Sequence, residues 1–120
     1  MSVSGKVEYV VGDTHPIAVL HPTNRRTGAA IPIASSGYSV VIRFSTVVGA
    51  RRSQVSEKTA TIFDDGGTDA AQYAFAAADL DIGPEPLAEA DLHWEWQITF
   101  PDGTVATTLD PKAVRIRNPL

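Results

Sequence analysis

No cysteine occurs among the 120 residues, which excludes disulfide bonds and thiolate metal sites. No apolar run approaches the length of a membrane span or a signal peptide, so we expect no membrane partner. Basic residues are also few, since ten Lys and Arg accompany fourteen Asp and Glu, and the net charge of -4 gives no broad basic surface for nucleic acid. The hydrophobic core alone must therefore stabilise the chain, and nucleic acid is not an expected partner.

The signatures of an active site are missing as well. His15, His21 and His93 have none of the short spacings typical of zinc ligands. The acidic run that contains Asp64 and Asp65 lacks the alternating ligands of a calcium loop. No Gly-x-Ser-x-Gly turn marks a nucleophile, and no glycine-rich loop is suited to phosphate. We therefore predict no catalytic residues, no metal, no cofactor and no small-molecule substrate, and an enzyme is a hypothesis that lacks the polar constellation it needs.

What the sequence does contain is a series of short β-branched and aromatic runs, separated by clusters of Gly, Pro, Asn and Asp. No window of helical length carries an apolar stripe with helical spacing. The expected strands are 7–11, 17–21, 38–45, 59–63, 72–76, 92–100, 104–109 and 114–117. This spacing predicts a single domain over residues 1–120 with an all-β fold, an immunoglobulin-like antiparallel β-sandwich of about seven to eight strands.

The clearest strand covers residues 92–100, where large apolar side chains alternate with polar ones. Its apolar positions are Leu92, Trp94, Trp96, Ile98 and Phe100. We expect both tryptophans to fill the space between two sheets rather than to form an exposed platform for sugar stacking. Residues 38–45 repeat the alternation, and we predict that they form the facing strand in the opposite sheet.

Local turn chemistry predicts how these strands connect. Pro101-Asp102-Gly103-Thr104 is a compact turn that joins two antiparallel strands. Residues 64–69 are expected to close a second hairpin through a longer loop. Residues 76–80 favour a single helical turn, and residues 49–58 are predicted to be an exposed excursion between strands.

Candidate docking residues lie in the first strand and in two basic pairs. The run around Val7, Tyr9 and Val11 has apolar residues on both faces, which is unusual for a strand left bare at a sheet edge. We therefore predict that a neighbouring copy or another protein docks there, and the alternative is that the run pairs inside its own sandwich. The pairs Arg25–Arg26 and Arg51–Arg52 can meet an acidic partner surface, or they can be solvated loop charge.

Five segments together resemble a known family. They are Gly12-Asp13-Thr14, Gly28, the strand 38–44, the run 73–80 and the run 96–104. This pattern, from about Gly12 to Arg117, is similar to the immunoglobulin-like domain at the N-terminus of tailed-phage baseplate upper proteins. The resemblance implies a non-enzymatic virion structural protein of the tail, baseplate, neck or capsid surface. Its partners would be other virion proteins or copies of itself, and it would be assembled into the virion in the host cytoplasm.

One segment departs from that family pattern. Relatives pass quickly from the Asp-Leu turn to the aromatic strand, whereas residues 84–90 form an additional Pro-rich link here. The alternative function is a carbohydrate-binding β-sandwich module that uses Trp94 and Trp96. That alternative requires the indole rings to be exposed beside polar residues.

Overall fold

The computed structural model of the chain describes residues 7–10, 17–24, 26–49, 51–108 and 112–118. Within these residues the chain forms strands joined by turns, with one 3₁₀ helix, η1 (Ala77–Leu80). The strands are β1 (Val7–Val10), β2 (Ile17–Leu20), β3 (Ser39–Val48), β4 (Arg51–Arg52), β5 (Ser56–Thr59), β6 (Thr61–Asp65), β7 (Thr68–Ala74), β8 (Glu89–Thr99), β9 (Val105–Thr107) and β10 (Lys112–Arg117). The prediction of an all-β chain is confirmed.

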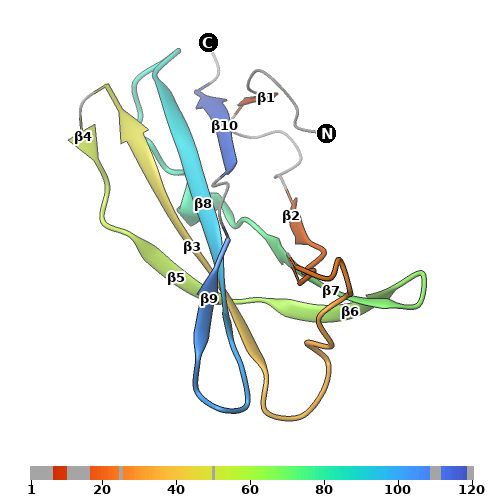
Figure 1. The fold of residues 1–120 in the computed structure, drawn as a ribbon. Coiled ribbons are helices and arrows are strands. Elements are labelled where there is room, and N and C mark those ends of the chain that lie inside the picture. Colours follow the sequence, from red (N-terminus) through yellow and green to blue (C-terminus); the bar gives the residue numbers. More distant parts are fainter. Residues whose placement is uncertain (1–6, 11–16, 25, 50, 109–111, 119–120) are drawn as a thin grey trace.

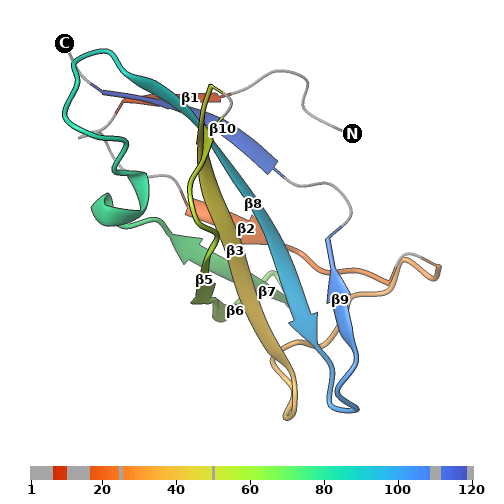
Figure 2. The ribbon, with the colours of Figure 1, turned by 90° about the vertical axis from the view of Figure 1, so that its left-hand side faces the viewer.

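The strands form two sheets that pack as layers (Figure 1). The larger sheet has seven strands in the order β1-β10-β8-β3-β4, with β5 also paired to β3 and β9 also paired to β8. The smaller sheet has three strands in the order β2-β7-β6. Figure 2 shows the smaller sheet behind the long strands β3 and β8. The architecture is therefore a β-sandwich with unequal layers.

Strands β3 and β8 form the centre of the larger sheet. They pair antiparallel, with Val40 opposite Ile98 and Ile42 opposite Trp96. The prediction that these two segments lie in opposite sheets is therefore wrong. Period-2 alternation tells which face of a strand is buried, but two neighbours in one sheet bury the same face, so their patterns look the same as those of facing strands.

The first strand also departs from the expectation of a purely antiparallel fold. β1 pairs parallel with β10, with Val7 opposite Val114 and Val10 opposite Arg117. A parallel pair needs a long connection between its strands, and here almost the whole domain lies between them. Nothing local to residues 7–10 reports such a partner.

Residues 49–58 are more regular than predicted. β4 pairs with the end of β3 through Arg52 opposite Val47, and β5 pairs with its middle through Glu57 opposite Arg43. Most side chains here are exposed, as expected, yet the backbone extends the sheet. An edge strand needs ladder hydrogen bonds on one side only, so it forms without an apolar pattern.

The two predicted hairpins are present. β6 and β7 pair as far as Asp65 opposite Thr68, so their loop is the two-residue turn Gly66-Gly67, with positive φ at both glycines, rather than the longer loop predicted. In the turn between β8 and β9, Asp102 Oδ1 accepts hydrogen bonds from the backbone N (2.9 Å) and the hydroxyl (2.6 Å) of Thr104. The second hairpin matches its prediction.

The core lies between the layers and centres on Phe75. Its ring centroid is 5.1 Å from that of Phe44, 5.2 Å from that of Tyr73 and 5.5 Å from that of Trp94. Trp96 is only 3% exposed, whereas Trp94 is half-buried and packs against the core from its margin. The predicted core role is therefore complete for one tryptophan and partial for the other.

The helical turn after β7 is held by one carboxylate. Asp79 Oδ2 accepts hydrogen bonds from the Tyr73 hydroxyl at 2.6 Å and from the backbone N of Ala76 at 2.8 Å. Burial, together with the hydrogen bond to Asp79 and its negative charge, raises the pKa of Tyr73 to about 12 from its ordinary value of 10.0. The predicted single helical turn is confirmed in η1, where Leu80 is buried.

Asn118 fixes the Pro-rich link that precedes β8. Its Nδ2 donates to the carbonyl oxygens of Gly83 at 2.7 Å and Glu85 at 2.8 Å, and its backbone N donates to Ala88 O at 2.9 Å. The Asn118 side chain is buried, so these bonds satisfy an amide that would otherwise be costly to bury. The additional link is therefore part of the packed domain.

We expect Trp96→Ala to lower the free energy of unfolding by about 3–5 kcal/mol, because the ring is almost fully buried and its loss leaves a cavity. Trp94→Ala should cost clearly less, because its ring already contacts solvent. Urea denaturation followed by circular dichroism measures both. Equal losses for the two variants would contradict this assignment of the rings.

Tyr73→Phe should lower stability by about 1 kcal/mol at neutral pH, the usual value of one hydrogen bond. Because the folded pKa of Tyr73 lies above its unfolded value, the wild type keeps this contribution below pH 10 and loses it as the pH rises to about 12. The stability difference between the two proteins should therefore narrow across that window. Parallel urea titrations from pH 8 to 12 test this, and a constant difference would contradict it.

Candidate docking surfaces

The larger sheet ends in a different strand on each side. On one side, β1 pairs with β10, and its other edge is the boundary of the sheet. Val7 and Tyr9 belong to this boundary strand, whereas Val11 lies outside the described residues. The alternative that β1 pairs within its own sandwich is therefore observed, and this pairing still leaves one strand edge at the boundary. That edge can accept hydrogen bonds from an added strand.

The two basic pairs lie in different parts of the molecule. Arg51 and Arg52 form β4 at the other boundary of the larger sheet. Arg26 is exposed in a turn where Asn24 Oδ1 accepts its backbone N–H at 2.9 Å, and Arg25 lies outside the described residues. Figures 1 and 2 show this turn beside the smaller sheet, away from β4. The predicted docking residues thus do not form one site.

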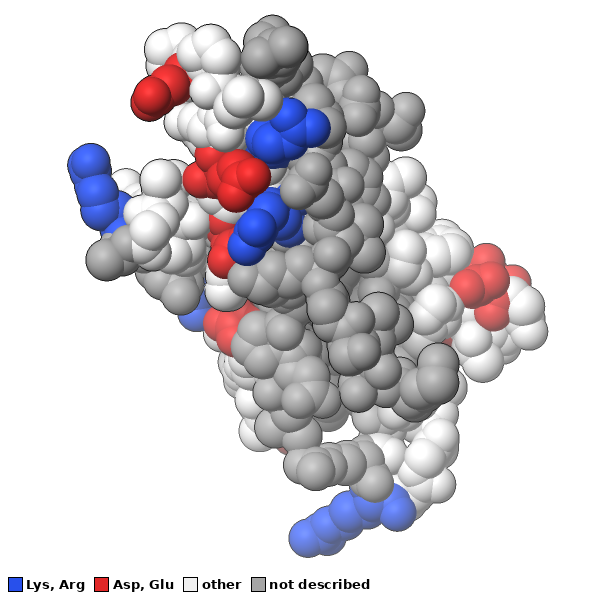
Figure 3. Space-filling model, turned by 90° about the horizontal axis from the view of Figure 1, so that it is seen from above, with Lys and Arg blue, Asp and Glu red and all other residues white. Residues whose placement is uncertain are grey.

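Charges of both signs alternate over the outer face of the larger sheet. Arg115 lies 3.6 Å from Glu89 and 3.7 Å from Asp91, measured between charged nitrogen and oxygen atoms. Figure 3 shows the same mixture as interleaved blue and red atoms. Such exposed pairs each contribute at most about 1 kcal/mol, so they set the pattern of the surface more than its stability.

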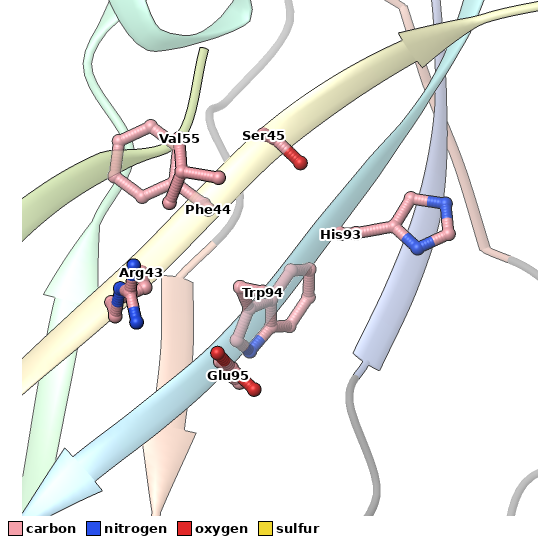
Figure 4. Close-up of a pocket in the computed structure, with 7 residues that line it drawn as sticks. All are labelled: Arg43, Phe44, Ser45, Val55, His93, Trp94 and Glu95. Atoms are coloured by element: carbon pink, nitrogen blue, oxygen red, sulfur yellow. The ribbon is translucent and has the colours of Figure 1, made fainter. Parts of the chain in front are cut away.

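A shallow pocket of about 220 Å³ lies on this outer face (Figure 4). Its polar lining brings Ser45 opposite His93 and Arg43 opposite Glu95 across β3 and β8. Sequence reasoning missed this pocket because it placed the two strands in opposite sheets. Ser45 is only 3% exposed, so its hydroxyl is not presented to a substrate as a nucleophile. The charges of Arg43 and Glu95 largely cancel.

A second hollow, of about 350 Å³, lies between β2 and the inner face of the larger sheet. β2 forms one wall together with His21, whose Nε2 is 2.7 Å from Asp65 Oδ2, and the other wall contains Trp94, Trp96 and Thr108. Ile17 and Val19, at 58% and 45% exposure, are among the most exposed large apolar residues of the described chain. The hollow is thus an apolar groove beside the edge of the smaller sheet.

No group of three or more His, Asp or Glu side chains is placed to hold a metal ion in the part of the chain that the structure describes. In the same part, no helix is long and apolar enough to cross a membrane. Comparison with protein-family models, with curated proteins and with solved structures found no match. The geometry of the two sheet boundaries and the groove is therefore the available guide to function.

Deleting residues 1–10 should leave a folded domain with reduced stability. β10 keeps its pairing with β8, and its buried residues Val114 and Ile116 stay in place, so only the boundary ladder is lost. A cooperative transition in urea, at a lower midpoint than that of the full chain, is the expected result. Loss of the β-sheet circular dichroism signal in buffer would show instead that β1 is required for the core.

Proposed function

We propose that this chain is a non-enzymatic structural component of a tailed-phage or phage-derived particle, and that it acts through protein–protein contacts. The observation that carries the proposal is the larger sheet, which has strands with open edges at both of its boundaries, β1 and β4. A solitary protein usually blunts or covers such edges, whereas an assembled protein uses them. The proposed partners are other virion proteins or copies of this chain, in the tail, baseplate, neck or capsid surface.

The strand order supports the finer assignment to an immunoglobulin-like sandwich. In that fold one sheet contains the second, fifth and fourth strands, and the other contains the third, sixth and seventh, with an additional strand beside the third in variable-type domains. Here β2, β7 and β6 correspond to the first set, and β3, β8 and β10 to the second. β4 and β5 take the place of the additional strand beside β3.

The segments that resemble the baseplate family occupy defined positions in this sandwich. Residues 73–80 form the end of β7 and η1, and residues 96–104 form the end of β8 and its turn. Gly12-Asp13-Thr14 lies outside the described residues. The departure at residues 84–90 is accommodated by the three hydrogen bonds of Asn118, so it does not oppose the resemblance.

The groove at β2 is the one observation that favours the carbohydrate-binding alternative. Trp94 lines it and is half-exposed, and His21 offers a polar atom nearby. However, Trp96 is buried, and the ring of Trp94 packs against Phe75. Sugar stacking requires an open aromatic face, so the groove supports this function less well than the sheet edges support assembly.

Immunogold electron microscopy tests the proposed function. Antibodies raised against the purified chain would be applied to phage-like particles isolated from induced cultures of the source organism. We expect gold at one fixed position on each tailed particle, and mass spectrometry of gradient-purified particles should contain peptides of the chain.

Antibodies pre-absorbed with the purified chain are the control, and they should leave the particles unlabelled. Particles that carry neither gold nor peptides of this chain would overturn the proposal. In that case, a glycan-binding screen of wild type and Trp94→Ala would decide the alternative, which expects binding by the wild type only.

A further inference from the structure

The two boundaries of the larger sheet lie at the same level. Across the sheet, Glu8 pairs with Arg115 and Arg115 with Asp91. Asp91 then pairs with Val47, and Val47 with Arg52. Glu8 of β1 and Arg52 of β4 are therefore the two ends of one continuous row. Because directly paired residues share a face, both ends belong to the outer face of the sheet.

The strand directions at the two boundaries are also opposite. β1 is parallel to β10, and each further step from β10 to β8, β3 and β4 is antiparallel. Three reversals leave β4 running against β1. If a second copy is placed beside the first with its outer face on the same side, its β1 meets β4 of the first as an antiparallel pair, the more stable arrangement.

The charges at the two boundaries are complementary. Glu8 is the only charged residue of β1, and β4 consists entirely of Arg51 and Arg52. In the side-by-side arrangement, the row that ends at Arg52 of one copy continues at Glu8 of the second. It then reads as alternating charges across the junction, which is the pattern already present inside the row at Arg115 and Asp91. Opposite charges directly across a strand pair are stabilising, and like charges are destabilising.

We propose that β1 of one copy adds to β4 of the next, so that copies of this chain join their larger sheets edge to edge. The inference deepens the proposed function, because it names a second copy as the partner at the β1 edge. The contact is heterologous, since two different surfaces meet, and it therefore produces a closed ring or an open filament. The right-handed twist of the sheet turns each copy relative to the last.

A single contact of this kind is weak. A four-residue strand against a two-residue strand buries far less than the roughly 1,000 Å² expected of a stable interface. Closure of a ring or attachment to a shared scaffold raises the effective concentration of the edges and makes the contact persist. The isolated chain should therefore associate only at high concentration and low salt, where the charge pair is least screened.

Disulfide trapping tests the contact directly, because the natural chain contains no cysteine. In the double variant Glu8→Cys with Arg52→Cys, four strand spacings of about 4.8 Å separate the two thiols within one chain, which is too far for an internal disulfide. In the proposed junction they are directly opposite each other. Mild oxidation should give a ladder of dimers, trimers and larger species on a non-reducing gel, and reductant should collapse it to monomer.

The matched control is Glu8→Cys with Arg26→Cys, which moves the second thiol to an exposed arginine in a turn outside the larger sheet. It should give at most a trace of the ladder. Equal ladders from both double variants, or monomer alone from Glu8→Cys with Arg52→Cys, would overturn the inference. Neither result affects the immunogold test, so the failure of self-association and the failure of the proposed function are distinguishable.

A charge-reversal set decides the question if the cysteine variants do not fold. Glu8→Arg should abolish the concentration-dependent rise in sedimentation coefficient at low salt, and so should Arg52→Glu. Their combination in one chain should restore it, since the opposite charges again face each other across the junction. Association that is unchanged in both single variants, or that is not restored in the double variant, overturns the inference.

Discussion

The rest of the structure depends on the pairing of β3 with β8. The register between them runs through nine successive residue pairs, from Ser39 opposite Thr99 to Val47 opposite Asp91. Alternate pairs point inward and supply Ile42, Phe44 and Trp96 to the core. The intervening pairs point outward and supply the pocket and the mixed charges. One register therefore determines both the stability of the sandwich and the chemistry of its exposed face.

The layers built on this pair are unequal, and the inequality creates the candidate surfaces. Seven strands in one sheet and three in the other leave β1 and β4 at distant boundaries, and they leave an apolar groove beside β2. None of these features resembles an active site. Ser45 is buried, the arginines of the outer face have carboxylates beside them, and the tryptophans are committed wholly or partly to the core. Strand edges are backbone surfaces, and they recognise another backbone rather than a small molecule.

This arrangement connects the family resemblance with a physical reason for assembly. An edge-to-edge contact contributes little by itself, yet it repeats identically around a particle. Weak, repeated contacts allow misplaced subunits to dissociate and correctly placed ones to persist through multivalency. Asn118 adds to this, because its hydrogen bonds to Gly83 and Glu85 tie the link before β8 to the end of β10, the strand that carries β1.

The sequence by itself determined the features that depend on neighbouring residues. Strand alternation in residues 92–100, the turn at Pro101–Thr104 and the helical turn at 77–80 follow from side-chain periodicity, proline and glycine chemistry, and local hydrogen bonding. Only the tertiary structure decided which strands pair. The parallel partner of β1, the common sheet of β3 and β8, and the level of Glu8 with Arg52 join residues far apart in the chain. A period-2 pattern specifies a buried face but carries no information about which neighbour shares it.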